Sequence, residues 1–215
     1  MPQFAKMTLY DGGRAPNPRR VQVFMAEKRI VIPRIEIDIN KLEQKSPAFS
    51  AINPMQRVPV LVLEDGTAIA ESMAICRYLE ELQPEPALMG RTAKERAIIE
   101  MWQRRIELQF LLPVAFAFRH LHRGAAHLEI PQIAEWGVAN QGRAREFMEF
   151  LDTELGRRRH VAGEDFTIAD ITAIVAYQFL RAGRIEPPLD LANVQRWQSQ
   201  VAARPSVQMP ERDGA

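Results

Sequence analysis

The stretch that decides the fold is NPMQRVPVLVLEDGTAIAESMAICRYLEE, which runs from Asn53 to Glu81. Its aliphatic run from Val58 to Leu63 predicts a buried strand, and the letters EDGT, around Asp65 and Gly66, predict a hairpin turn. Ala68 to Ala70 then predicts a short return strand. The stretch therefore encodes a strand pair that leads directly into a helix.

That helix has its apolar positions on one face, as the spacing of a buried amphipathic helix requires. The apolar positions are Ile75, Cys76, Leu79 and Leu82. Two polar residues, Glu71 and Ser72, open the helix. Taken alone, Ser72 is an ordinary N-cap and Glu71 an acidic residue that complements the helix dipole.

The residues before this stretch predict alternating strands and helices. Met7 to Tyr10 predicts a short strand, and the loop DGGRAPNP leads into an amphipathic helix from about Asn17 to Arg29. Ile35, Ile37 and Ile39 alternate with acidic residues, which is the period of a strand. KSPAFSAINP predicts a short polar helix or turn. The order is strand, helix, strand, helix, strand, strand, helix.

The remainder of the chain carries helical patterns only. A Pro-rich segment, QPEPALMG (residues 83–90), predicts a break in the chain, and the linker is placed at residues 84–91. The patterns that follow predict a helical bundle: Ala93–Arg123, Ile130–Leu155, Ile168–Ala182 and Val194–Ala202. Pro113 predicts a kink in the first of these helices. Thr167, with Asp170 three residues later, predicts a capping box.

The composition narrows the range of partners. The chain has 215 residues, 47% hydrophobic and 26% charged, with 28 Lys and Arg against 27 Asp and Glu. This balance provides no net field to gather nucleic acid or an anionic membrane, so a small-molecule partner is expected. One cysteine, Cys76, excludes an internal disulfide and a four-cysteine zinc site. The start, MPQFAKMTLY, lacks an apolar signal core, so a cytoplasmic location is expected.

Three motifs in a fixed order resemble the cytosolic glutathione transferase superfamily. They are Val58-Pro59 before the third strand, Glu71-Ser72 at the start of the next helix, and FTIADI, which includes Thr167–Asp170. Each motif is common by itself, and the combination carries the specificity. The resemblance covers nearly the whole chain.

The resemblance implies an α/β N-terminal thioredoxin-like domain with a mixed four-stranded sheet over residues 1–83, the linker 84–91, and an all-α helical-bundle domain over residues 92–215. It implies a cytoplasmic, homodimeric glutathione S-transferase that conjugates the glutathione thiolate to a small electrophile in detoxification. Glutathione is the expected co-substrate, and no metal, nucleic acid or membrane partner is expected. A glutathione-dependent disulfide reductase and a non-catalytic binding or regulatory protein on the same fold are the alternatives.

The resemblance also assigns the glutathione-binding residues. Pro59 is expected in the cis form, which turns the backbone N–H and C=O of Val58 toward the cysteine portion of glutathione, as an added strand would. Ser72 is expected to bind the γ-glutamyl carboxylate at a helix N-terminus, and Glu71 to counter the ligand's ammonium. The polar residues before Val58 are expected at the glycyl carboxylate. The full binding set is Gln56, Arg57, Val58, Pro59, Glu71 and Ser72.

The catalytic group is harder to assign, because Ala15 stands where similar family members carry a serine or threonine hydroxyl. A transferase must lower the pKa of the glutathione thiol so that thiolate exists near neutral pH. Asn17, whose amide can donate to sulfur, is the first candidate, and the phenol of Tyr10 is its rival. A helix cap explains Asn17 equally well, and a core aromatic explains Tyr10.

The electrophile pocket is expected between the two domains, against the helix that carries Phe116, Arg119 and His120. Aromatic residues on such a helix are also typical of a core. His120 and His122 are two residues apart and point in roughly opposite directions, so a shared metal ion is not expected. Cys76, on the apolar face of its helix, is expected to be a packed hydrophobic residue and not a nucleophile.

Overall fold

A computed structural model describes residues 2–208 of the chain. The chain divides into two compact units, the first ending at Leu88 and the second beginning at Met89. This division falls within the predicted linker. The predicted domains extend to both ends of the chain, where Met1 and residues 209–215 lie outside the described residues.

The first unit is built on a mixed four-stranded sheet, as predicted. The strands are β1 (Thr8–Asp11), β2 (Arg34–Glu36), β3 (Val60–Val62) and β4 (Ala68–Ala70), in the order β2-β1-β3-β4. Strand β1 is central: Tyr10 lies opposite Ile35 of the parallel β2 and opposite Val60 of the antiparallel β3. Strands β3 and β4 form the predicted antiparallel hairpin. This arrangement confirms the α/β thioredoxin-like class.

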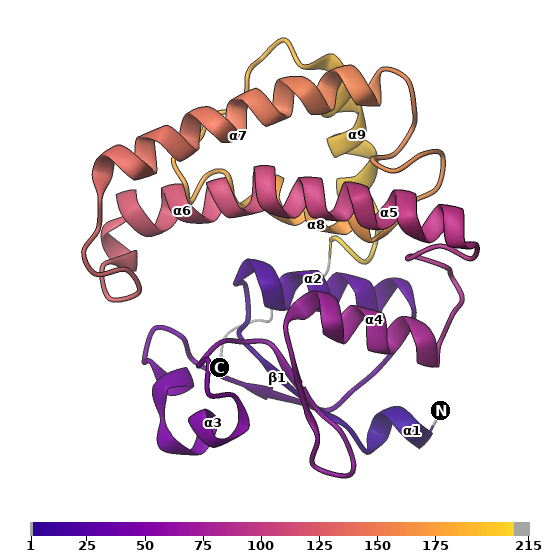
Figure 1. The fold of residues 1–215 in the computed structure, drawn as a ribbon, viewed down its shortest axis with the longest axis vertical. Coiled ribbons are helices and arrows are strands. Elements are labelled where there is room, and N and C mark those ends of the chain that lie inside the picture. The colour runs from indigo at the N-terminus through magenta and orange to yellow at the C-terminus, as the bar shows by residue number, and fades with distance from the viewer. Residues whose placement is uncertain (1, 209–215) are drawn as a thin grey trace. The chain divides into compact units, whose positions relative to one another are not determined.

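Two helices cover one face of this sheet. The helical segments of the unit are α1 (Pro2–Ala5), α2 (Pro16–Glu27), the 3-10 turn η1 (Glu43–Lys45), α3 (Pro47–Ile52) and α4 (Ser72–Leu82). Helices α2 and α4 pack side by side (Figure 1). Leu9 of β1, Phe24 of α2 and Leu79 of α4 are fully buried in the core beneath them. The pairing brings the starts of these two helices into one neighbourhood.

Strands β2 and β3 are shorter than predicted. Strand β3 begins two residues late, at Val60, because Pro59 has no N–H to donate to the sheet. Strand β2 comprises only Arg34–Glu36 and is exposed, since it lies at the sheet edge. After it, the Asp38 carboxylate accepts hydrogen bonds from the N–H groups two and three residues later, at 2.9 and 3.3 Å. This local turn ends the alternating pattern as a strand.

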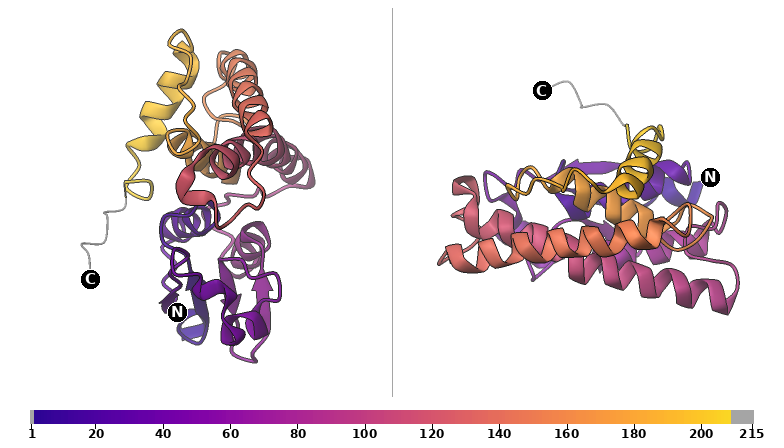
Figure 2. Two further views of the ribbon diagram at one scale, coloured as in Figure 1. Left: turned by 90° about the vertical axis from the view of Figure 1, so that its left-hand side faces the viewer. Right: turned by 90° about the horizontal axis from the view of Figure 1, so that it is seen from above.

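The second unit is all-α among the described residues. Its elements are α5 (Ala93–Ile106), the π-helical turn η2 (Glu107–Leu111), α6 (Leu112–Leu121), the 3-10 turn η3 (Arg123–Ala125), α7 (Ala134–Leu155), α8 (Ile168–Phe179) and α9 (Ala192–Ala202). Helix α7 runs beside α6 (Figures 1 and 2). The predicted all-α class of this domain is therefore confirmed. Two of its helices differ from the predicted ranges, and both differences lie next to a proline.

Both changes follow from what proline does to a helix. The expected irregularity near Pro113 takes the form of the π-helical turn η2 (Glu107–Leu111), just before it. Pro113 has no N–H, and its ring crowds the carbonyl four residues earlier, so a regular α-helical turn is disfavoured there. Helix α7 begins at Ala134 and not at Ile130. Pro131 disfavours the helical conformation in the residue before it.

A buried carboxylate, Asp170, organises the core of the helical unit. Asp170 is fully buried and accepts hydrogen bonds from the backbone N–H groups of Val161 and Thr167, each at 3.0 Å, and from Nε1 of Trp197 at 2.8 Å. His160 Nδ1 lies 3.4 Å from the same carboxylate. The predicted capping box between Thr167 and Asp170 is present. Asp170 thus joins α8 to α9 and to the loop before α8.

A buried lysine performs a similar role in the first unit. Lys28, at the end of α2, is 1% exposed, and its Nζ donates to the carbonyls of Gln83 at 2.6 Å and Pro86 at 2.7 Å. The carboxylate of Glu80 lies 2.7 Å from the same ammonium. Lys28 therefore ties α2 to the segment that follows α4.

Substitution Asp170→Ala should lower the free energy of unfolding by about 3–5 kcal/mol, because it leaves several buried donors without an acceptor. Urea denaturation followed by tryptophan fluorescence measures this change. Asp165→Ala is the matched control, since Asp165 is exposed five residues earlier. Equal stability of the Asp170→Ala variant and the wild-type protein would contradict the anchoring role.

Candidate functional site

Helix α4 begins where the sequence predicted, with Glu71 and Ser72. Ser72 is its first residue and is 4% exposed, whereas Glu71 is the exposed N-cap. Glu71 adopts φ 67° and ψ 116°, a conformation that is unfavourable for a residue with a side chain. Such backbone outliers concentrate at ligand sites. The first N–H groups of α4 lack helical partners and favour an anion.

The Ser72 hydroxyl connects α4 to α2. Arg20 of α2 is fully buried, and its Nη1 donates to Ser72 Oγ at 2.8 Å. Ser72 Oγ in turn donates to Asn17 Oδ1 through a longer hydrogen bond of 3.5 Å. The structure therefore brings together two predicted residues, Ser72 and Asn17, beside an arginine that was not predicted from the sequence.

Helix α2 begins without a side-chain cap. Ala15 is the N-cap residue and makes no capping hydrogen bond from its side chain. Pro16 and Pro18 have no N–H, so the first turn of the helix presents little besides the backbone N–H and the side chain of Asn17. Asn17 is exposed. The start of α2 thus offers amide donors and a positive helix dipole, with no hydroxyl.

Tyr10 lies on the other face of the sheet from α2. Successive strand residues point to opposite faces. The carboxylate of Asp11 faces α2, where Gln22 Nε2 donates to its two oxygens at 3.0 and 2.9 Å. The ring of Tyr10 packs edge-on against Phe49 of α3, with 6.0 Å between ring centroids. The geometry therefore favours Asn17 over Tyr10 as the group nearest to Ser72.

The peptide bond between Val58 and Pro59 is cis, as the family resemblance implied. Within residues 2–208, neither the N–H nor the C=O of Val58 has a backbone hydrogen-bonding partner. The Val58 side chain lies against the loop after β1: a Cβ on Gly12 would stand 2.5 Å from Val58 Cγ2 and 3.2 Å from Pro18 Cγ. The absence of a side chain at Gly12 thus allows the loop, the start of α2 and Val58 to pack together.

The polar residues before Val58 have different surroundings. Gln56 adopts φ 54°, and its Nε2 donates to Ser50 Oγ at 2.9 Å. The side chain of Arg57 is exposed, and its carbonyl accepts from Asn53 Nδ2 at 2.8 Å. Asn53 is buried, and its Oδ1 accepts from the N–H of Met55 at 3.1 Å. Asn53 therefore holds the shape of the loop that carries Gln56 and Arg57.

In the helical unit, the three predicted pocket residues lie together near the end of α6. The Phe116 ring is 6.5 Å from the His120 ring and 6.2 Å from the Trp136 ring. Arg119 Nη1 donates to Glu129 Oε2 at 3.0 Å, and His120 Nδ1 accepts from the Ile133 N–H at 3.0 Å. Because Nδ1 accepts, the neutral imidazole of His120 carries its proton on Nε2. These contacts fix all three side chains.

Cys76 is a packed core residue, as the sequence predicted. It is fully buried, and burial raises the pKa of its thiol to about 12. Such a thiol stays protonated near neutral pH and is not a nucleophile. Within residues 2–208, no group of three His, Cys, Asp or Glu side chains is placed to hold a metal ion. No helix in the described part of the chain is long and apolar enough to cross a membrane.

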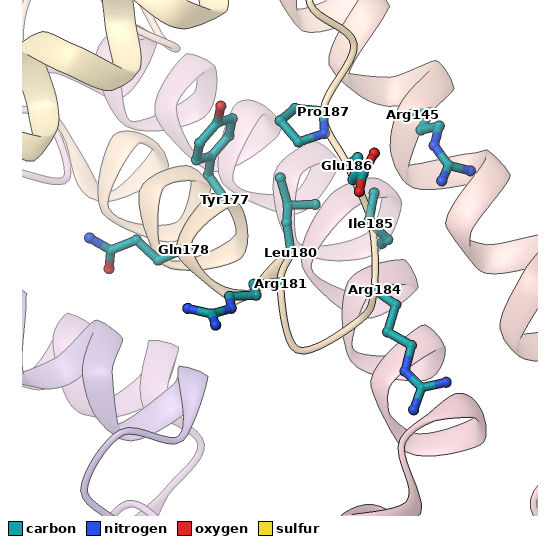
Figure 3. A pocket seen from close by; sticks show the side chains of 9 residues that line it. All are labelled: Arg145, Tyr177, Gln178, Leu180, Arg181, Arg184, Ile185, Glu186 and Pro187. Atoms are coloured by element: carbon teal, nitrogen blue, oxygen red, sulfur yellow. The ribbon is translucent and has the colours of Figure 1, made fainter.

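A cavity of about 470 Å³ lies in the helical unit, between α7, the end of α8 and the loop that follows it. It is lined by apolar groups such as Leu180 and by Arg145, Arg181 and Arg184. Figure 3 shows these three guanidinium groups pointing in different directions, with the carboxylate of Glu186 also at the cavity. The charges therefore do not converge on one anionic ligand.

Three residues of the candidate site were not predicted from the sequence: Arg20, Asn53 and Gly12. Arg20 had a weak signal, because it follows Asn17 by three residues and so lies on the same side of α2. Its partner Ser72 is 52 residues away along the chain, a separation that no local pattern reveals. Asn53 precedes a proline, which is typical of a turn. Gly12 had no signal, because its role depends on contact with Val58.

Comparisons with known proteins agree with this geometry. Residues 15–82 match the family described as Glutathione S-transferase, N-terminal domain, and residues 135–205 match Glutathione S-transferase, C-terminal domain. Glutathione S-transferase 2 of Saccharomyces cerevisiae is 38% identical over 205 residues, which cover 94% of this chain and 88% of that protein.

Solved structures give the same result. The crystal structure of Gtt2 from Saccharomyces cerevisiae matches with a TM-score of 0.88 at 37% identity, covering 93% of this chain and 98% of that one. A glutathione S-transferase domain-containing protein from Marinobacter aquaeolei VT8 matches with a TM-score of 0.90 at 36% identity, covering 93% and 99%. These matches confirm the fold and the transferase function predicted from the sequence, and the chain belongs to the glutathione S-transferase family.

Proposed function

We propose that this transferase binds glutathione in its first unit and activates the thiol with Asn17. The observation that carries the proposal is the chain of contacts from Arg20 through Ser72 to Asn17, at 2.8 and 3.5 Å. It joins the predicted carboxylate site to the predicted thiol-activating group. Val58, packed against Gly12 and near the start of α2, completes the set.

The peptide part of glutathione would bind to Val58 as an added strand. The unpartnered N–H and C=O of Val58 can exchange two hydrogen bonds with the central amide of the ligand. The γ-glutamyl carboxylate would lie at the start of α4, where the N–H of Ser72, the helix dipole and the guanidinium of Arg20 all favour an anion. Glu71 would pair with the ligand's ammonium, and Gln56 and Arg57 would face the glycyl carboxylate.

Thiol activation would then depend on amide donors and not on a hydroxyl. Asn17 would donate from Nδ2 to the glutathione sulfur, and the positive start of α2 would stabilise the negative charge. The thiolate sulfur then attacks an electrophilic carbon, forming a sulfur–carbon bond while the leaving group departs with its electron pair. We propose Phe116, Arg119 and His120 as the residues that face this electrophile.

Disulfide reduction is the second candidate, because the same thiolate can attack a mixed disulfide. The single cysteine is buried, so glutathione itself would have to supply both thiols of that reaction. Ala15, which lacks a hydroxyl, keeps a non-catalytic binding role open as a third candidate. Turnover of a chloronitroaromatic supports the transferase, turnover of a glutathione mixed disulfide supports the reductase, and retention on immobilised glutathione without turnover supports the binding protein.

Substitution Ser72→Ala should weaken glutathione binding about three- to tenfold, because it removes the hydroxyl that joins Arg20 to the start of α4. Isothermal titration calorimetry measures the dissociation constant. The control Ser199→Ala changes an exposed serine of α9 and should bind as the wild-type protein does. Unchanged affinity in the Ser72→Ala variant would contradict this placement of glutathione.

Substitution Asn17→Ala should raise the thiol pKa of bound glutathione by about half to one unit, because the thiolate loses a donor. Titration of the ultraviolet thiolate absorbance of the complex measures this pKa. Tyr10→Phe keeps the ring contact with Phe49 and should leave the thiol pKa unchanged. A rise with Tyr10→Phe and none with Asn17→Ala would transfer the role to Tyr10.

We also propose that the enzyme is a cytoplasmic, detoxifying homodimer with an isologous interface. Exposed apolar side chains on α5, η2 and α7 support such an interface, since large apolar surfaces mark contact sites. They include Met101, Leu108, Trp136, Val138 and Phe150. Sedimentation velocity should give twice the 24.5 kDa mass of the chain. A single species of one-chain mass at all protein concentrations would rule out the dimer.

A further inference from the structure

An exposed amide such as Asn17 needs something to hold its orientation if its NH₂ group is to meet a sulfur atom. We propose that Arg20 is a positioning residue for the reaction: acting through Ser72, it turns the Asn17 carboxamide so that Nδ2 faces the glutathione thiolate. This inference rests on the proposed function, in which Asn17 activates the thiol. It adds a residue that touches neither substrate nor reacting atoms.

The first link is the contact between Arg20 and Ser72. Arg20 is 0% exposed and its Nη1 lies 2.8 Å from Ser72 Oγ. A guanidinium has only donors, so Ser72 Oγ must accept at this contact. The hydroxyl proton of Ser72 is consequently directed elsewhere. Arg20 and Ser72 are both buried, so this contact is shielded from solvent.

The second link carries this direction to Asn17. Ser72 Oγ lies 3.5 Å from Asn17 Oδ1, and the serine proton points into this contact. A hydroxyl that accepts from a cation becomes a better donor, because hydrogen bonds in a chain polarise one another. The polarised hydroxyl therefore selects the amide oxygen of Asn17 as its partner. The amide NH₂ is left on the opposite side, free to donate to a ligand.

The start of α2 gives no alternative means of holding this amide. Ala15 makes no capping hydrogen bond, and Asn17 is exposed. The hydrogen bond from Ser72 Oγ thus orients the carboxamide of Asn17. Because Arg20 donates to Ser72 Oγ, the serine proton is directed toward Asn17. It follows that the Ser72 hydroxyl both holds Arg20 at the start of α4 and orients Asn17, while the Ser72 backbone N–H binds the γ-glutamyl carboxylate.

Two measurements separate this role from simple charge stabilisation of the bound peptide. The thiol pKa of bound glutathione reports on Asn17, whereas the dissociation constant of S-methylglutathione reports on peptide binding without a thiol. Arg20→Met should raise the thiol pKa by about half a unit. In an Asn17→Ala background the same substitution should add nothing, because two residues that act through one contact are not additive.

Further variants keep the test decisive if Arg20→Met does not fold. Ser72→Ala leaves Arg20 in place but breaks the chain, and should raise the thiol pKa. Ser72→Thr retains the hydroxyl, so its thiol pKa should lie closer to the wild-type value than that of Ser72→Ala. Arg29→Met is the matched control, since it removes an equal charge from an exposed residue just after α2 and should leave the thiol pKa unchanged.

The outcomes distinguish this inference from the proposed function. If Asn17→Ala raises the thiol pKa but neither Arg20→Met nor Ser72→Ala does, the positioning role is wrong and the proposed function stands. Additive shifts in the double variant would show that Arg20 acts on the thiolate directly, and would also overturn it. If Asn17→Ala has no effect on the thiol pKa, the proposed activation fails, and the role of Arg20 falls with it.

Discussion

The hydrogen bond between the buried Arg20 guanidinium and Ser72 is the interaction on which the site depends, because it joins the starts of α2 and α4 across 52 residues of sequence. Removing a guanidinium from water is unfavourable unless it is paired. Once the pair is formed, the N-termini of α2 and α4 lie close together, and the fields of their dipoles add at an anion bound there. The sheet below supplies the base on which both helices rest.

In the proposed function, this arrangement takes the place of a hydroxyl at position 15. The amide of Asn17 and the dipole of α2 are fixed groups that would stabilise a thiolate as a hydroxyl donor does, with little change of orientation when the charge forms. Ala15 has no hydroxyl, and Pro16 and Pro18 have no N–H, so the backbone N–H and the side chain of Asn17 are the main donors in the first turn of α2. The proposed chemistry therefore depends on where backbone and amide groups are placed more than on a reactive side chain.

Most of the fold could be predicted from the sequence because its signals are local. The hairpin after Val58, the apolar face of α4 and the Thr167–Asp170 capping box depend on residues close together in the chain, and each is present. The predictions were wrong where one residue overrides a pattern. The alternating isoleucines gave only a short edge strand, since Asp38 closes a turn after it.

The site could be predicted only in part, for the same reason. Asn17, Val58 and Ser72 carry motif signals, but Arg20 and Gly12 matter only through partners that are distant in sequence. Lys28 shows the same limit: its spacing places it on the apolar side of α2, but no local pattern indicates that its ammonium is enclosed by the carbonyls after α4. Such contacts form only when segments distant in the sequence pack together, so local sequence patterns do not reveal them.

Gly12 also bears on how such an enzyme can evolve. A methyl group there would meet Val58 at 2.5 Å and Ile39 at 2.9 Å, so even alanine would force one of these side chains to move. The proposed function places Val58 against the ligand. A single mutation at position 12 would therefore disturb two segments at once, the loop after β1 and the loop before β3. Selection is thus expected to keep glycine at this position.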